Sequence, residues 1–212
     1  MQKRKFDLPD MYLELAEGTA EWYMGTHFFE EACDLYDAEE IVKQGKKFAG
    51  NQIYFIHYPD GSVYKPFEGR ENVYYERPVW DKDCFGILSV DFSEGRIDIY
   101  TYCPGNAAEI LATLPLTSVK DCYNLKVEMS PWTLGRQADS EYEIIWPLKK
   151  IFPIRDNESM ICRDGDVLYF SRWTEEPYYQ EYVVTVDINT GKELNVEKGS
   201  LYLMPDGTLW NV

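Results

Sequence analysis

Short glycine-centred reversals recur along the chain between segments rich in Val, Ile, Tyr and Phe. Two β-prone runs in residues 53–64 flank Asp60-Gly61, and such a dipeptide between such runs is the strongest short signal for a β-hairpin. Each reversal sends the backbone back beside itself, so the chain is predicted to be mainly antiparallel β. The further reversals are at Glu94-Gly95, Asp164-Gly165, near Gly191, and at Asp206-Gly207.

These reversals define five predicted hairpins, and the segments between the hairpins are long enough for further strands. Two further strands are predicted at residues 125–129 and 142–146, where apolar and aromatic residues alternate with polar ones. The hairpins are predicted at residues 53–64, 88–100, 160–170, 183–194 and 201–210.

The N-terminal part of the chain has a different pattern. Residues 7–18 are predicted to form a short helix, because Asp7 can cap it, Pro9 suits a first turn and Gly18 can close it. A second helix is predicted over residues 26–43, with irregular structure as the alternative. We therefore expect a single domain, 1–212, with a helical or irregular segment at 7–45 and a β-hairpin repeat region at 50–212.

Two pairs of hairpin segments are similar to each other. YPDGSVY at 58–64 is similar to MPDGTLW at 204–210, and VDFSEGRI at 90–97 is similar to VDINTGKEL at 186–194. In addition, ILATLPL at 110–116 leads through a polar loop into NLKV at 124–127, as the outer strand of one propeller blade leads into the inner strand of the next.

From about residue 51 to 212 the chain thus resembles small β-propeller-like proteins of unknown function, although it lacks the WD and kelch patterns of named families. The resemblance implies a propeller-like architecture, and it implies nothing about activity. A β-sandwich or barrel is the alternative, because these folds also use many short strands joined by regular turns.

Charge and cysteine content restrict partners and location. The net charge of −16 repels phosphate backbones, so nucleic acid is not expected as a partner. No run of 18 apolar residues predicts a membrane span, and the N-terminus lacks the apolar run of a signal peptide. The cysteines contain no CxxC pair and are interpreted as buried thiols in a reducing compartment, which predicts a cytoplasmic protein; they are Cys33, Cys84, Cys103, Cys122 and Cys162.

Few residues in the sequence suggest a catalytic, metal-binding or ligand-binding site. The two histidines, His27 and His57, are interpreted as structural, and no phosphate-binding glycine loop is present, so we expect no catalytic residue, metal or cofactor. In the run from Trp80 to Asp83, two carboxylates two residues apart would point the same way on a strand and could bind a cation; a polar surface turn is the alternative. The predicted ligand-binding residues, which combine this run with aromatic and cationic side chains, are Trp80, Asp81, Asp83, Trp132, Arg136 and Trp173.

Two functional classes follow from these features. The favoured one is a non-enzymatic binding or protein-interaction module on a rigid β scaffold rich in Tyr and Trp. The alternative is a carbohydrate-binding protein or glycoside-active enzyme that uses paired carboxylates and aromatic stacking. The acidic segment Glu30–Glu40 adds a third hypothesis, in which the chain meets a basic partner.

Overall fold

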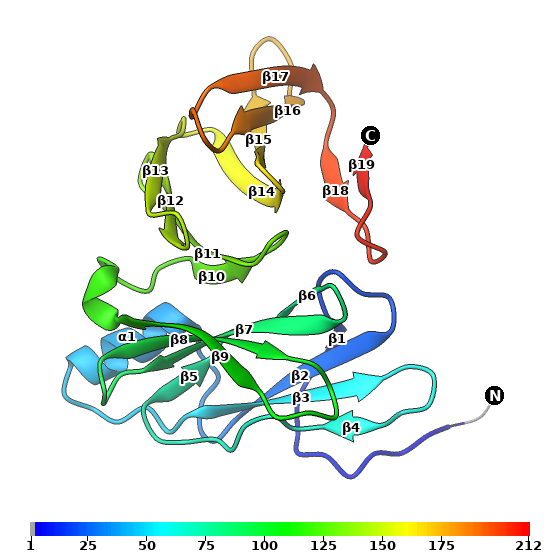
Figure 1. Cartoon of the computed structure of the whole chain (residues 1–212), viewed down its shortest axis with the longest axis vertical. Coiled ribbons are helices and arrows are strands. Elements are labelled where there is room, and N and C mark those ends of the chain that lie inside the picture. Colours follow the sequence, from blue (N-terminus) through cyan, green and yellow to red (C-terminus); the bar gives the residue numbers. More distant parts are fainter. Residues whose placement is uncertain (1–2) are drawn as a thin grey trace.

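Strands that follow each other in the chain pair in every sheet, with the exception of β5 and β6, and this defines the topology (Figure 1). The computed structural model describes residues 3–212. The first sheet has the order β1-β2-β3-β4. Its strands are β1 (Leu13–Leu15), β2 (Trp22–Phe28), β3 (Asn51–His57) and β4 (Val63–Tyr64), and helix α1 (Leu35–Lys43) lies between β2 and β3 in the chain.

The second sheet has five strands in the order β5-β7-β8-β9, with β6 also paired to β7. Its strands are β5 (Val73–Tyr75), β6 (Val79–Asp81), β7 (Cys84–Asp91), β8 (Arg96–Tyr102) and β9 (Glu109–Pro115). The chain then passes through a 3₁₀ turn, η1 (Leu116–Ser118), into the third sheet, which contains β10 (Leu125–Glu128), β11 (Thr133–Ala138), β12 (Glu141–Trp146) and β13 (Lys150–Pro153).

The remaining strands form a fourth sheet and a separate hairpin. The fourth sheet contains β14 (Glu158–Asp164), β15 (Val167–Thr174), β16 (Gln180–Asp187) and β17 (Glu193–Lys198). The hairpin consists of β18 (Leu201–Leu203) and β19 (Leu209–Asn211). In Figure 1 the third and fourth sheets and the hairpin form an arc above the first two sheets, with β14 and β18 on its inner side.

Strand β7 organises the core because both of its faces are covered. Phe85 and Ile87 pack with residues of the first sheet, and the Phe85 ring stacks on Phe55 at a centroid distance of 4.1 Å. Leu88 and Val90 point the opposite way and pack against the third sheet and α1. A strand covered on both faces needs a nearly continuous apolar sequence, and CFGILSVD has this character.

Gly86 also belongs to the face of β7 that meets the third sheet. A β-carbon at this position would lie 2.8 Å from the Trp132 ring, so only glycine lets that indole lie against the strand. The contact fixes the β10–β11 turn, which carries Trp132, on the second sheet.

The prediction of a helix at residues 7–18 is wrong. Residues 13–15 form strand β1, which pairs with β2, and Gly18 has a left-handed φ of +84° in the turn between them. The prediction for 26–43 is wrong in its first half: β2 extends to Phe28 and pairs with β3 over seven residues. The helix begins only at Leu35, after Asp34 accepts a hydrogen bond from the Asp37 amide at 2.7 Å.

The segment 7–45, predicted to be helical or irregular, supplies two strands of the first sheet in addition to α1. The helix signals at Asp7, Pro9 and Gly18 are local and weak, and the pairing of β1 with β2 outweighs them. Within residues 3–212, no helix combines the length and apolar character required to cross a bilayer.

The mainly β fold class is confirmed, and so are the five hairpins and the two further strands, which are β10 and β12 of the third sheet. Residues 110–116 are predicted to lead into residues 124–127 as one sheet leads into the next. This connection is confirmed, because β9 is the last strand of the second sheet and β10 is the first strand of the third. The similar sequence pairs, however, occupy different places: residues 58–64 join the last two strands of the first sheet, whereas 204–210 join β18 to β19. Their likeness reflects shared turn chemistry.

The interpretation of all five cysteines as thiols is wrong. Cys84 and Cys103 form a disulfide at the open end of the β7–β8 pair, with Cα atoms 4.3 Å apart. Cys33, Cys122 and Cys162 are free thiols. Burial raises the pKa of Cys33 to about 11 and that of Cys122 and Cys162 to about 12.

Removing this disulfide is expected to destabilise the protein. Cross-linking residues 19 apart restricts the unfolded chain, and loop-closure entropy assigns about 3 kcal/mol to a loop of this length. The double variant Cys84→Ser/Cys103→Ser should therefore unfold about 10 °C lower in a thermal melt. The control is Cys33→Ser, which leaves the cross-link intact. Alkylation of the denatured, unreduced wild type should modify three thiols, and modification of five would contradict the bond.

Candidate functional site

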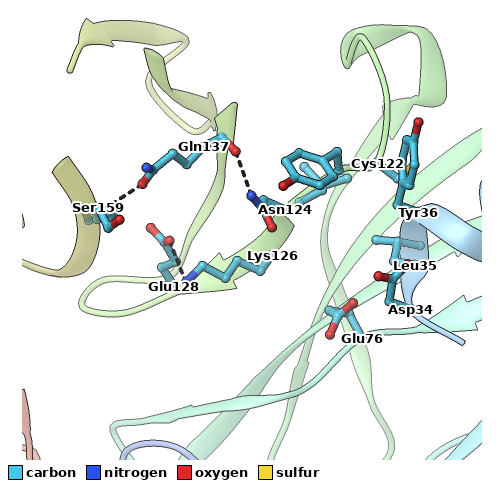
Figure 2. A pocket seen from close by; sticks show the side chains of 13 residues that line it. Asp34, Leu35, Tyr36, Glu76, Cys122, Asn124, Lys126, Glu128, Gln137 and Ser159 are labelled. Carbon is cyan, nitrogen blue, oxygen red and sulfur yellow. Dashed lines mark hydrogen bonds and ion pairs between the residues drawn. The ribbon is translucent and has the colours of Figure 1, made fainter. Parts of the chain in front are cut away.

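A cavity of about 410 Å³ opens where α1 meets the second, third and fourth sheets (Figure 2). It combines carboxylates, an ammonium group, amides and two tyrosines. The residues that define it here are Asp34, Tyr36, Glu76, Tyr123, Lys126 and Glu128.

One buried carboxylate fixes the helix to the wall of this cavity. Glu39 of α1 is 5% exposed and accepts a hydrogen bond of 2.9 Å from the backbone amide of Cys122, just before β10. Lys43, one turn later on the helix, lies 3.1 Å from the same carboxylate. The link holds Tyr36 on the helix against Tyr123 in the loop, with ring centroids 5.6 Å apart in an edge-to-face arrangement.

Gln137 of β11 forms the polar wall opposite the helix. Its backbone carbonyl accepts a hydrogen bond from the Asn124 side chain at 3.0 Å, and its side-chain oxygen accepts one from the Met160 amide at 2.7 Å. Its side-chain nitrogen donates to the carbonyl of Glu158 at 3.0 Å. These bonds tie the third sheet to β14 and engage the Gln137 side chain in the fold.

Two carboxylates that line this cavity differ in whether a cationic side chain pairs with them. Lys126 lies 3.2 Å from Glu128, which also accepts a hydrogen bond from the Tyr142 hydroxyl. Glu76 follows directly after β5, and the only hydrogen bond that its carboxylate accepts among the described residues is from the adjacent Arg77 amide at 2.9 Å. Burial raises the pKa of Glu76 above its ordinary value of 4.5, and the negative charge of Asp34 adds to this increase.

A second cavity, of about 790 Å³, adjoins the first because both are lined by Asp34 and Glu76. It runs beside β1 and β2, and it adds the carboxylates of Asp10, Glu14 and Glu30. Its arginine, Arg77, already pairs with Glu14. Acidic groups therefore outnumber basic ones along both cavities. Among residues 3–212, no group of three or more His, Cys, Asp and Glu side chains is arranged to hold a metal ion.

The predicted residues Trp80, Asp81 and Trp132 gather near β6 and β7. Trp80 packs on Phe85 at 4.7 Å, and Asp81 accepts a hydrogen bond of 2.7 Å from the Ser130 hydroxyl. The Trp132 indole nitrogen is buried and has no hydrogen-bond partner among the described residues.

Asp83 does not share a strand with Asp81. Lys82 and Asp83 have φ values of +51° and +72° and form the tight turn between β6 and β7. The expectation that the two carboxylates point the same way along a strand is thus wrong, because the chain reverses between them.

Arg136 and Trp173 lie in other parts of the fold. Arg136 is 3% exposed and binds Asp121 at 2.6 Å and Glu143 at 3.5 Å, so it stabilises the third sheet. Trp173 belongs to β15 in the fourth sheet. The structure brings together three of the six predicted residues, and their role in ligand binding stays a prediction.

The residues around the cavity were missed because no local pattern marks them. Glu76, Lys126 and Tyr36 are separated in sequence by 40 to 50 positions at each step and meet only through the packing of α1 and two sheets. The one sequence signal was the acidic segment Glu30–Glu40, which supplies Asp34 to both cavities.

Comparison with known proteins gives no family. No family model matches the chain, and no curated protein matches it. Among solved structures, one that is similar belongs to a structural and mechanistic study of two prolyl endopeptidases, which addressed the role of inter-domain dynamics in catalysis and specificity. The TM-score is 0.49 at 14% identity over 94% of this chain, which spans 30% of the length of that protein. A structural similarity this low does not support any inference about the function of this chain.

Substitution of Glu39 should loosen the cavity wall. Glu39→Ala leaves the Cys122 amide buried without an acceptor, and such a loss costs about 1–3 kcal/mol. Chemical denaturation should show this decrease in the free energy of unfolding. Glu40→Ala is the matched control, because Glu40 is on the same helix and its carboxylate pairs, among the described residues, with Lys43 at the surface. Equal destabilisation by both variants would contradict the assigned role of Glu39.

Proposed function

We propose that this protein is a non-enzymatic binding module whose cavity between α1, β10 and β14 holds a cationic group, either an ammonium or a guanidinium. The observation that carries the proposal is Glu76, a carboxylate held in a protein-lined cavity with no cationic side chain bonded to it.

Electrostatics supports a cationic ligand. Burial makes the charged form of Glu76 unfavourable, and the nearby charges of Arg77 and Lys126 offset this only in part, so its pKa stays raised. Both of those cations are already paired, Arg77 with Glu14 and Lys126 with Glu128. A ligand ammonium would supply the missing positive charge, and the face of Tyr36 or Tyr123 would offer a cation–π contact at the rim.

A propeller-like arrangement is the scaffold that we propose for this site. Three of the four successive sheets are meanders, and in the second sheet β5 and β6 both pair with β7. The connection from β9 to β10 joins the end of one sheet to the start of the next. Such repetition supports blades, in which loops and strand ends from several sheets border a common site. A β-sandwich would instead pair two faces around one core.

Glu76→Gln should abolish most binding of a cationic ligand. The substitution keeps the size of the side chain and removes its charge, so affinity for spermidine should fall about tenfold or more, measured by calorimetry at low salt. Glu71→Gln is the control, because Glu71 is exposed and its pair with Lys47 lies outside both cavities. Equal binding by wild type and Glu76→Gln would refute the site.

Binding should also weaken in acid. The neutral form of Glu76 is favoured until the pH exceeds its raised pKa, and a bound cation favours the charged form. Affinity should therefore decrease as the pH falls through that raised pKa and should be restored above it. A wild-type affinity that is constant from about pH 7.5 to about pH 4.5 would contradict this assignment.

A carbohydrate ligand is the second candidate, supported by the Tyr36–Tyr123 pair at the cavity rim. Tyrosine rings stack on sugar faces, and the neighbouring carboxylates could hydrogen-bond hydroxyl groups. In a thermal-shift screen, oligosaccharides would then stabilise the wild type by a few degrees, and Tyr123→Ala would lose this effect. No shift with any sugar at millimolar concentration would eliminate this candidate.

The cytoplasmic location predicted from the cysteine pattern stays a prediction. The Cys84–Cys103 disulfide supports the opposite assignment, since such bonds persist in oxidising compartments.

A further inference from the structure

The β18–β19 hairpin carries apolar side chains without burying any of them. Every residue from 201 to 212 is half-buried or exposed. Tyr202 and Trp210 face each other across the hairpin and are 55% and 56% exposed, and Val212 is 80% exposed. An isolated two-stranded hairpin is marginally stable in water, so this one gains stability when another surface covers it.

The backbone of β19 has a free edge that can form a regular strand pair. Ser200 and Val212 exchange two backbone hydrogen bonds, of 2.9 and 3.0 Å. By the alternation of an antiparallel pair, Trp210 turns its amide and carbonyl toward Tyr202, whereas Leu209 and Asn211 turn theirs away from β18. Figure 1 shows β19 on the outer side of β18, away from the fourth sheet.

We propose that β19 pairs with β19 of a second copy of this chain, in antiparallel orientation about a two-fold axis. With the axis beside Trp210, Leu209 of one copy lies opposite Asn211 of the other, and their outward amides and carbonyls form four hydrogen bonds. The two Trp210 side chains then meet on one face. The result is a four-stranded antiparallel sheet, and three of the other sheets in the chain also have four strands.

Charge favours a second copy at this place rather than a charged partner. Residues 199–212 contain one charged side chain, Asp206, although the whole chain has a net charge of −16. A surface that is apolar and depleted in charge is typical of the centre of a protein interface. Two acidic copies repel each other less when a surface with so few charges forms the contact.

The size of the contact sets the expected strength. Pairing along β19 covers Trp210 and the outward backbone of Leu209 and Asn211, whereas Tyr202 is on β18, one strand away from the partner, so less than about 600 Å² per copy is buried. The total is at the low end of specific interfaces, which indicates a reversible dimer with a dissociation constant of about 10–100 µM. This association is independent of the proposed cation site, which involves none of these residues.

Sedimentation velocity of the 212-residue chain from about 5 to about 300 µM tests the proposal. The mass should rise from 24.9 kDa toward twice that value, and added salt should strengthen association by screening the repulsion between acidic copies. A monomer at the highest concentration would overturn the proposal. Association that weakens with salt would also overturn it, because it would show a contact between charged surfaces.

Two variants locate the contact. Trp210→Lys places a charge at the two-fold axis, and Asn211→Pro removes an outward amide without breaking a bond to β18. Each should weaken dimerisation at least tenfold while far-UV circular dichroism and Tm stay close to those of the wild type. Tyr178→Lys, at a residue 76% exposed elsewhere on the surface, is the matched control and should dimerise normally. Dimers unaffected by both hairpin variants would place the interface elsewhere and refute the proposal.

Discussion

Burial of β7 on both faces is the constraint on which the rest of the structure depends. One set of its side chains packs with the first sheet, and the alternate set packs with the third sheet and α1. A single strand thereby fixes the relative positions of three sheets and the helix. The cavity beside α1 lies on the side of β7 that faces the third sheet. Its shape therefore depends on how closely β10 and α1 approach the second sheet.

The parts of the fold that could be predicted are those encoded by neighbouring residues. The Asp60-Gly61 and Asp164-Gly165 turns determine their hairpins locally, because glycine accepts the positive φ that each reversal requires. The N-terminal strands could not be predicted in this way. Leu13–Leu15 has no strand pattern of its own, and it becomes a strand only because β2 provides a partner.

The candidate site shows the same limit more strongly. Glu76, Lys126 and Tyr36 come from three separate elements, and each residue alone is an ordinary surface type. The six residues predicted from sequence were chosen because tryptophan and paired acids are conspicuous. In the structure the most conspicuous of them stabilise the fold: Arg136 holds two carboxylates, and Trp132 fills the space that Gly86 leaves. The acidic residues that line the cavity were not conspicuous among 37 acids.

The state of the cysteines has a consequence for how the chain survives oxidation and refolding. Disulfide exchange begins with attack by a thiolate, and a thiol of pKa about 12 is ionised to roughly one part in 10⁵ at neutral pH. Cys122 and Cys162 are also enclosed by the native fold. These two thiols therefore do not exchange with the Cys84–Cys103 bond as long as the sheets stay packed, which leaves the half-buried Cys33 as the one free thiol within residues 3–212 that the native fold does not enclose.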